Sequence, residues 1–195
     1  MSKIALSGNA SGTGTFTVAS PNSNTDRTLT LPDATGTILT TATPGVPVNG
    51  PAFSAYRTAD QTVTNNTATK VQLNIEEYDT NNCFDSTTNY RFTPNVAGYY
   101  QVNFSIYGKS SANDLTLNTA RIVKNGADLA YGFSGQGAYI YIPSRSYVDG
   151  AAVGSTLVYM NGSTDYIELY ARIVASGTIA VGSAYFQAFL ARSAT

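Results

Sequence analysis

The sequence predicts an all-β protein built as a sandwich of antiparallel strands. Residues 99–107 alternate strictly, since large apolar side chains are separated by Gln, Asn and Ser. Two Asn-Gly steps, Asn125-Gly126 and Asn161-Gly162, follow apolar runs and predict type I′ hairpin turns. No stretch of about ten residues has helical periodicity. The apolar runs recur roughly every 8–12 residues, which is typical of the strands of a β-sandwich.

The composition excludes several classes of function. The chain has 195 residues, 11 basic and 12 acidic side chains, a net charge of −1 and no histidine. Without histidine there is no Ser–His–Asp triad, no Cys–His dyad and no histidine-ligated zinc. Because the charge is balanced and the lysines are scattered, we expect no binding to nucleic acid, which needs a basic stripe. The single cysteine, Cys83, excludes an internal disulfide, and we interpret it as a buried small hydrophobe.

The first part of the chain differs from the rest in composition. Residues 1–44 are rich in Gly, Thr, Ser and Asn, and Phe16 is their single aromatic residue. Short alternating runs at 14–19, 28–31 and 37–40 predict three thin strands, which need a partner chain to be stable. This segment is therefore expected to be β-rich and to serve attachment or to form a stalk.

A linker and a larger domain follow. Residues 45–51 are rich in proline and glycine and predict a stiff linker. Residues 52–195 contain all the remaining aromatic side chains and are expected to form one domain. Within it, alternation along 166–173 points Leu169 to the core and Glu168 toward solvent. The run 184–191 is apolar on both faces, which predicts the core on one side and a neighbouring subunit on the other.

One segment of this domain has a specific spacing of aromatic residues and glycine. Phe92 is followed by Gly98, Tyr100 and Phe104, and the run continues as an alternating strand. This pattern resembles the signature of the C1q-domain family, and similar landmarks extend the resemblance over residues 52–195. Leu73 and Val102 depart from it, because the family usually has Phe at those positions.

The resemblance implies a C1q/TNF-like jelly roll of ten strands that assembles as a tight homotrimer. It also implies which residues pack the core or the trimer interface. These are Phe92, Gly98, Tyr100, Val102, Phe104, Phe186, Phe189 and Leu190.

A second resemblance lies in the first segment. The run Thr28-Leu29-Thr30-Leu31-Pro32-Asp33, followed by Gly36-Thr37, is similar to a module of tailed-bacteriophage fibre and appendage proteins over residues 13–41. The resemblance implies that residues 1–44 contact other virion proteins. Together, the two resemblances imply a virion fibre that ends in a trimeric knob.

The densest acidic cluster supplies the candidates for a calcium site, namely Glu76, Asp79 and Asp85. As an EF-hand loop the cluster fails, because Phe84 stands where that loop needs glycine. We therefore expect a solvated loop with no metal, and no cofactor is indicated elsewhere. The pair Asp165 and Glu168 is the other candidate for carboxylate chemistry, but we expect outward, solvated positions and no enzyme activity.

A glycine-rich run at 132–137 is followed by neither a helix nor a lysine, so it does not indicate a phosphate site. The run precedes an aromatic stretch with a nearby cation. Because tyrosine offers flat apolar area and a hydroxyl, we select Tyr139, Tyr141 and Arg145 as candidates for contact with a receptor. The other interpretation is ordinary strand packing.

These observations favour a structural protein of a bacteriophage virion, a tail or head fibre or appendage. Its homotrimeric head would serve adhesion to a host-surface glycan or protein, or decoration of the particle. A cellular, secreted C1q-like lectin or adhesion module is the alternative, and a polysaccharide-degrading fibre enzyme is a third. The first eight residues have no apolar core of a signal peptide, so we expect synthesis in the host cytoplasm, location in the virion and no membrane insertion.

Overall fold

The computed structural model describes residues 50–129, 139–141 and 149–194, and in the first segment residues 11–15, 17, 19, 22–26 and 28. The chain divides into two units, Met1–Ile38 and Leu39–Thr195, each described by itself. None of the described residues of the first unit lies in a strand.

Of the strand expected at 14–19, Gly14, Thr15, Thr17 and Ala19 are described and are not in a strand in the single chain, and Phe16 and Val18 lie outside the described residues. The strand expected at 37–40, and 28–31 apart from Thr28, lie outside the described residues.

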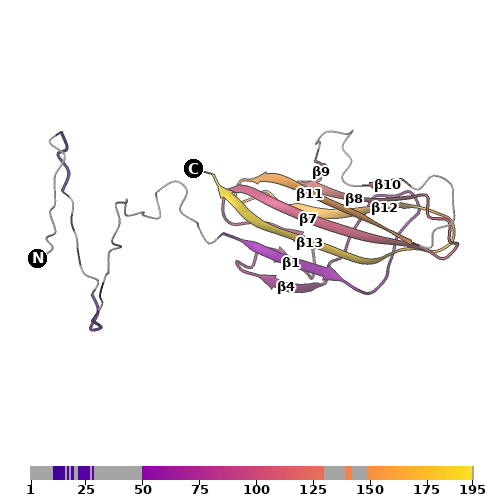
Figure 1. The fold of residues 1–195 in the computed structure, drawn as a ribbon, viewed down its shortest axis with the longest axis horizontal. Coiled ribbons are helices and arrows are strands. Elements are labelled where there is room, and N and C mark those ends of the chain that lie inside the picture. Colours follow the sequence, from indigo (N-terminus) through magenta and orange to yellow (C-terminus); the bar gives the residue numbers. More distant parts are fainter. Residues whose placement is uncertain are drawn as a thin grey trace, which may run out of the picture. The chain divides into compact units, whose positions relative to one another are not determined.

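Every regular secondary-structure element described in the second unit is a β-strand (Figure 1). They are β1 (Ala52–Arg57), β2 (Gln61–Thr62), β3 (Thr69–Lys70), β4 (Ile75–Asp79), β5 (Phe84–Asp85), β6 (Arg91–Phe92), β7 (Gly98–Ser110), β8 (Leu117–Lys124), β9 (Ala127–Asp128), β10 (Tyr139–Tyr141), β11 (Asp149–Met160), β12 (Ile167–Val174) and β13 (Ile179–Ser193).

The strands form two antiparallel sheets with the order of a jelly roll. Sheet A runs β11-β7-β13-β1-β4, with β2 beside β13, and sheet B runs β10-β8-β12-β6-β5, with β3 beside β12 and β9 beside β8. The chain crosses repeatedly between the sheets, and early strands pair with late ones: β1 pairs with β13 and β6 pairs with β12. This wrapping of early strands against late ones is the double Greek key of a jelly roll. The expected all-β jelly-roll sandwich is confirmed, and the two main paths contain ten of the described strands.

An aromatic cluster joins the sheets in the core. The Phe53 ring stacks on Phe84 and Phe92 at centroid distances of 4.6 and 4.5 Å, and meets the edge of Phe186 at 5.0 Å. Phe92 in turn contacts Tyr100 at 5.5 Å. Because Phe84 and Phe92 belong to sheet B and the other rings to sheet A, this cluster holds the two layers face to face.

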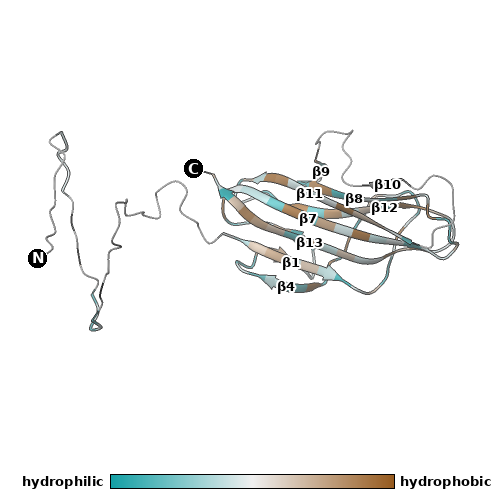
Figure 2. Ribbon diagram, in the orientation of Figure 1, coloured by the Kyte–Doolittle hydropathy of each residue, from teal (hydrophilic) through white to brown (hydrophobic). Residues whose placement is uncertain are grey.

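Strand β7 shows how the alternation is used. Its buried and less buried residues alternate along thirteen positions, and Figure 2 shows the matching change of hydropathy along the ribbon. Gly98 begins the strand where a side chain has no room, because a Cβ there would lie 2.4 Å from the Arg192 carbonyl oxygen. The two faces of β7 are the ones expected from its sequence.

The two Asn-Gly steps behave differently. Asn125 and Gly126 both have positive φ, 53° and 81°, so the hairpin turn between β8 and β9 is confirmed. At the second step only Gly162 has positive φ, and the expected type I′ turn is wrong. The reason is that β11 and β12 belong to different sheets, so the chain must cross the sandwich there. Asn161 organises this crossing, because its Oδ1 accepts the N–H groups of the three residues 163–165 at 2.9–3.0 Å.

Candidate self-association face

The outer face of sheet A, the face turned away from the core, carries the exposed apolar side chains of the domain. Six large hydrophobic side chains among the described residues are exposed, each by 43 to 66%. All six occupy outward positions of sheet A strands, as the burial pattern and the register place them. They are Tyr78, Tyr99, Val153, Leu157, Tyr159 and Phe189.

The middle of this face carries no charge. The stretches 99–107 of β7, 151–159 of β11 and 183–189 of β13 contain no acidic or basic residue. Their outward positions hold Gln, Asn, Ser and Tyr between the apolar side chains. Surfaces of monomeric proteins rarely expose many large apolar side chains on one face, so six of them beside these uncharged stretches indicate an interface.

Polar side chains on the face are already paired with each other. Gln101 Nε2 donates to Ser155 Oγ at 2.7 Å, and Ser155 Oγ donates to Asn103 Oδ1 at 2.9 Å. On the β4 side, Tyr185 donates from its hydroxyl to Glu77 Oε2 at 3.4 Å, and Ser54 Oγ lies 2.9 Å from the same oxygen. Because these groups satisfy one another within the chain, covering the face leaves few of them without a partner.

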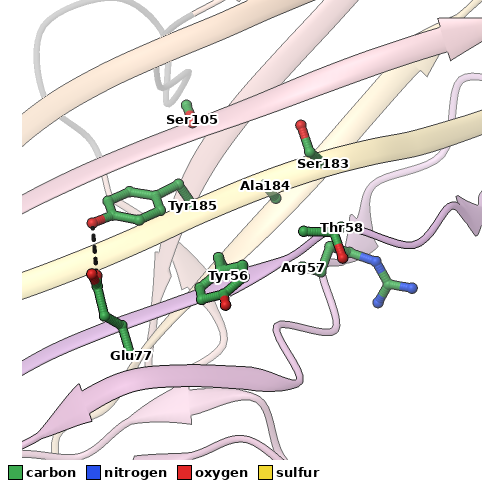
Figure 3. A pocket seen from close by; sticks show the side chains of 8 residues that line it. All are labelled: Tyr56, Arg57, Thr58, Glu77, Ser105, Ser183, Ala184 and Tyr185. Atoms are coloured by element: carbon green, nitrogen blue, oxygen red, sulfur yellow. Dashed lines mark hydrogen bonds between the residues drawn. The ribbon is translucent and has the colours of Figure 1, made fainter.

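Two adjoining hollows lie on this face. One has a volume of about 430 Å³ and is lined by Tyr56, Glu77 and Tyr185 with neighbouring residues of β1, β7 and β13 (Figure 3). Figure 3 shows Tyr185 and Glu77 meeting across β13 and β4. The second, of about 450 Å³, lies beside Val153 and Ser155 and shares Tyr185 with the first. A protruding side chain of another molecule can enter on either side of the Tyr185 ring.

The residues selected for core or trimer packing fall into two places. Tyr100, Val102, Phe104, Phe92 and Phe186 are buried in the core, each at most 5% exposed. Burial also raises the pKa of the Tyr100 phenol, whose hydroxyl donates to the Val96 carbonyl oxygen at 2.8 Å.

The other members lie at the edge of the core or outside it. Leu190 is partly buried against the core, beside the position where Gly98 leaves no room for a Cβ. Phe189, one residue before it, is 48% exposed on the outer face of sheet A. The run 184–191 thus has one side in the core and the other uncovered in the single chain.

The calcium candidates do not converge on a common point. Both oxygens of Asp79 accept backbone N–H groups of its own loop, from Asn81 and Phe84. Asp85 likewise accepts N–H groups from residues 87–89, and these hydrogen bonds hold the pKa of its carboxyl far below the usual range. Glu76 is exposed on β4. Among the described residues, no group of three His, Cys, Asp or Glu side chains is arranged to hold a metal ion.

Glu168 was expected to point into solvent, and this prediction is wrong. Its residue is only 4% exposed, and its carboxylate forms an ion pair of 2.6 Å with Lys70 Nζ. The reason is that β12 lies inside sheet B, where Lys70 on the neighbouring β3 covers it. Asp165, which was also expected to be solvated, is not: its side chain is 13% exposed and pairs with Lys124 Nζ at 2.7 Å.

Of the receptor-contact candidates, only the backbone of Tyr139 and Tyr141 is among the described parts of the chain. The backbone of Tyr139 and Tyr141 belongs to β10, which pairs with β8 in sheet B. Arg145 lies outside the described residues, and so does the glycine run at 132–137. Cys83 is buried as expected, and this burial raises the pKa of its thiol.

Sequence reasoning named Phe189 but missed the other exposed side chains of the face. Tyr99 and Tyr159 contact each other at a centroid distance of 5.4 Å, although they lie 60 positions apart in the sequence. The available signal was the outward half of each alternation. In 151–159, Val153, Leu157 and Tyr159 share one parity, which is the outward one.

Comparison with known proteins gives the following similarities. No family model matches the chain, and no curated protein does. Among solved structures, the chain is similar to the vertex protein P5 of PRD1, with 15% identity, a TM-score of 0.47 and coverage of 75% of this chain and 74% of that one. It is similar to the Eiger TNF of S. frugiperda, with 12% identity, a TM-score of 0.45 and coverage of 74% and 96%. For murine APRIL at pH 5.0 the identity is 10%, the TM-score 0.42 and the coverage 71% and 99%.

Within the described part of the chain, no helix has the length and apolar character needed to cross a membrane.

Proposed function

We propose that the chain is a structural protein of a bacteriophage virion whose domain, residues 52–195, forms a homotrimeric head through the outer face of sheet A. The observation that carries the proposal is this face, which has uncharged stretches on β7, β11 and β13 and holds all six exposed large hydrophobic side chains among the described residues. Covering a half-exposed side chain of this size contributes on the order of 1 kcal/mol, so six of them in each copy favour a stable assembly.

The number of copies and the location come from the sequence resemblances. The C1q-like spacing around Phe92 and Gly98 supports three copies, and the fibre-like module at 13–41 supports attachment of residues 1–44 to other virion proteins. Three heads around one axis would present three equal sites. Such multivalency raises avidity without a stronger single contact, which suits adhesion to a host surface or decoration of a particle.

The test is the mass of the full chain in solution. Light scattering over a range of concentrations is expected to give three times the monomer mass of 20.6 kDa. Leu157→Arg places a charge at an exposed apolar position of the face, on β11, and is expected to yield a folded monomer. Ala127→Arg, at an exposed position of β9 in sheet B, is the matched control and is expected to remain a trimer.

A wild-type monomer would contradict the proposed assembly. A Leu157→Arg variant that keeps the trimer mass would place the interface elsewhere. Circular dichroism of each variant distinguishes lost assembly from lost folding.

A further inference from the structure

The outer face of sheet B has a different chemistry from that of sheet A. Its outward positions hold Lys70 on β3, Arg91 on β6, Arg121 on β8, and Tyr170 and Arg172 on β12. The register sets Tyr170 directly between Lys70 and Arg121, and sets Arg91 beside Glu168. One tyrosine therefore lies among four cations on a continuous surface.

The acidic side chains of this face are already engaged. Glu168 pairs with Lys70 at 2.6 Å, and Asp128 pairs with Arg121 at 2.7 Å. Asp85 lies opposite Arg91 in the register, but both of its oxygens accept hydrogen bonds from its own turn. The carboxylates thus leave two guanidinium groups without an ion-pair partner.

Arg91 and Arg172 are these two groups. Both are half-buried, and no ion pair among the described residues includes either of them. Arg91 lies over the Tyr166 ring, 4.4 Å from its centroid, and none of the described residues accepts a hydrogen bond from its guanidinium. Among the described residues, the guanidinium of Arg172 donates only to a neutral acceptor, Asn66 Oδ1. A planar guanidinium held in this way keeps donors for a carboxylate or sulfate.

We infer that the outer face of sheet B is a binding surface for an acidic polysaccharide, with Arg91 and Arg172 contacting its anionic groups. Arg91 is aligned with Glu168, four residues before Arg172, so the two cations are separated by about 13 Å along β12. Tyr170 lies between them, and its ring offers an apolar contact to the sugar that spans the gap. A chain of sugars with repeated negative charge fits this spacing better than one small anion does.

This inference rests on the proposed function, because it takes sheet A as covered by other copies and sheet B as the outward surface. A nucleic acid is the less favoured polyanion. The chain carries a net charge of −1, whereas surfaces that bind nucleic acid are strongly basic.

The experiment measures binding of the full chain to immobilised polygalacturonate and dextran sulfate, with neutral dextran and a single-stranded oligonucleotide as further probes. The wild type is expected to bind at least one acidic polysaccharide, to ignore dextran and to bind the oligonucleotide more weakly. R91Q/R172Q removes both positive charges but keeps polar, hydrogen-bonding side chains, and is expected to lose at least tenfold in affinity. K109A/R192A removes two cations that lie outside sheet B, and is expected to stay within twofold of the wild type.

Several results would overturn the inference. They are no binding by the wild type, an equal loss in both double variants, or equal binding to the oligonucleotide. Light scattering on the same samples separates the two proposals. A trimer that does not bind defeats this inference alone, whereas a monomer that binds through Arg91 and Arg172 defeats the trimeric head alone.

Discussion

The two sheets use the same alternation of side chains but present different outer faces. On sheet A, the outward side chains within 99–107 of β7, 151–159 of β11 and 183–189 of β13 are aromatic, aliphatic or uncharged polar. On sheet B, those of β3, β6, β8 and β12 include four cations and a buried carboxylate. The inward half of each strand makes the sandwich, and the outward half decides what each face meets.

The largest expected effect separates inward from outward positions on one strand. Phe104→Asp places an unpaired carboxylate at a position that is 5% exposed, and we expect no soluble protein, since the cost exceeds about 4 kcal/mol. Asn103→Asp adds the same charge one residue away on the outer face and is expected to remain folded and soluble. The measurement is the soluble yield, followed by circular dichroism. Full solubility of the Phe104→Asp variant would refute the assignment of faces along β7.

A smaller loss of stability is expected when an ion pair on the outer face of sheet B is removed. Glu168→Gln leaves the Lys70 ammonium with the Asn89 carbonyl oxygen as its acceptor, and we expect a loss of about 1–3 kcal/mol in the free energy of unfolding. Asp128→Asn removes a more exposed pair, Arg121–Asp128, and is expected to cost less than about 1 kcal/mol. Urea denaturation measures both. Equal losses would mean that burial does not distinguish the two pairs.

The smallest expected effect is a pH-dependent change in stability at Asp85, which ends β5 and precedes a turn. The backbone N–H groups of residues 87–89 lower the pKa of Asp85 in the folded state, so its contribution is present above its ordinary pKa of 3.8 and is lost as the pH falls below that value. Asp85→Asn is expected to cost about 1 kcal/mol at pH 7. The gap between variant and wild type should narrow below about pH 4. Urea denaturation at pH 7, 5 and 3 measures it, and a gap that stays constant would contradict the role of the charge.

The fold was predictable where the information is local. The alternation of 99–107 gives the two faces of β7, and Asn125-Gly126 gives the hairpin of β8 and β9, because both signals lie within a few residues. Asn161-Gly162 has the same dipeptide but crosses between sheets, and no local pattern distinguishes the two cases.

The candidate face was predictable only in part. The two-sided apolar run at 184–191 indicated an uncovered surface, and Phe189 lies on it. Its extent needed the register, which brings Leu157 beside Gln101 and Gln101 beside Phe189 from three strands. The burial of Glu168 was not predictable for the same reason, since its partner Lys70 lies 98 residues away in the sequence.

The position of β11 at the edge of sheet A determines how fast its amide protons exchange with solvent. Strand β11 ends the sheet, so its twelve residues pair with β7 along one edge, and no strand among the described residues is hydrogen-bonded along the other. In an antiparallel strand every second amide points to the unpaired edge. Those amide protons exchange quickly with deuterium in a free chain and slowly where another molecule covers the edge. The exchange rates of the outward-pointing amides of β11 therefore show, residue by residue, whether this edge of sheet A is open to water or covered.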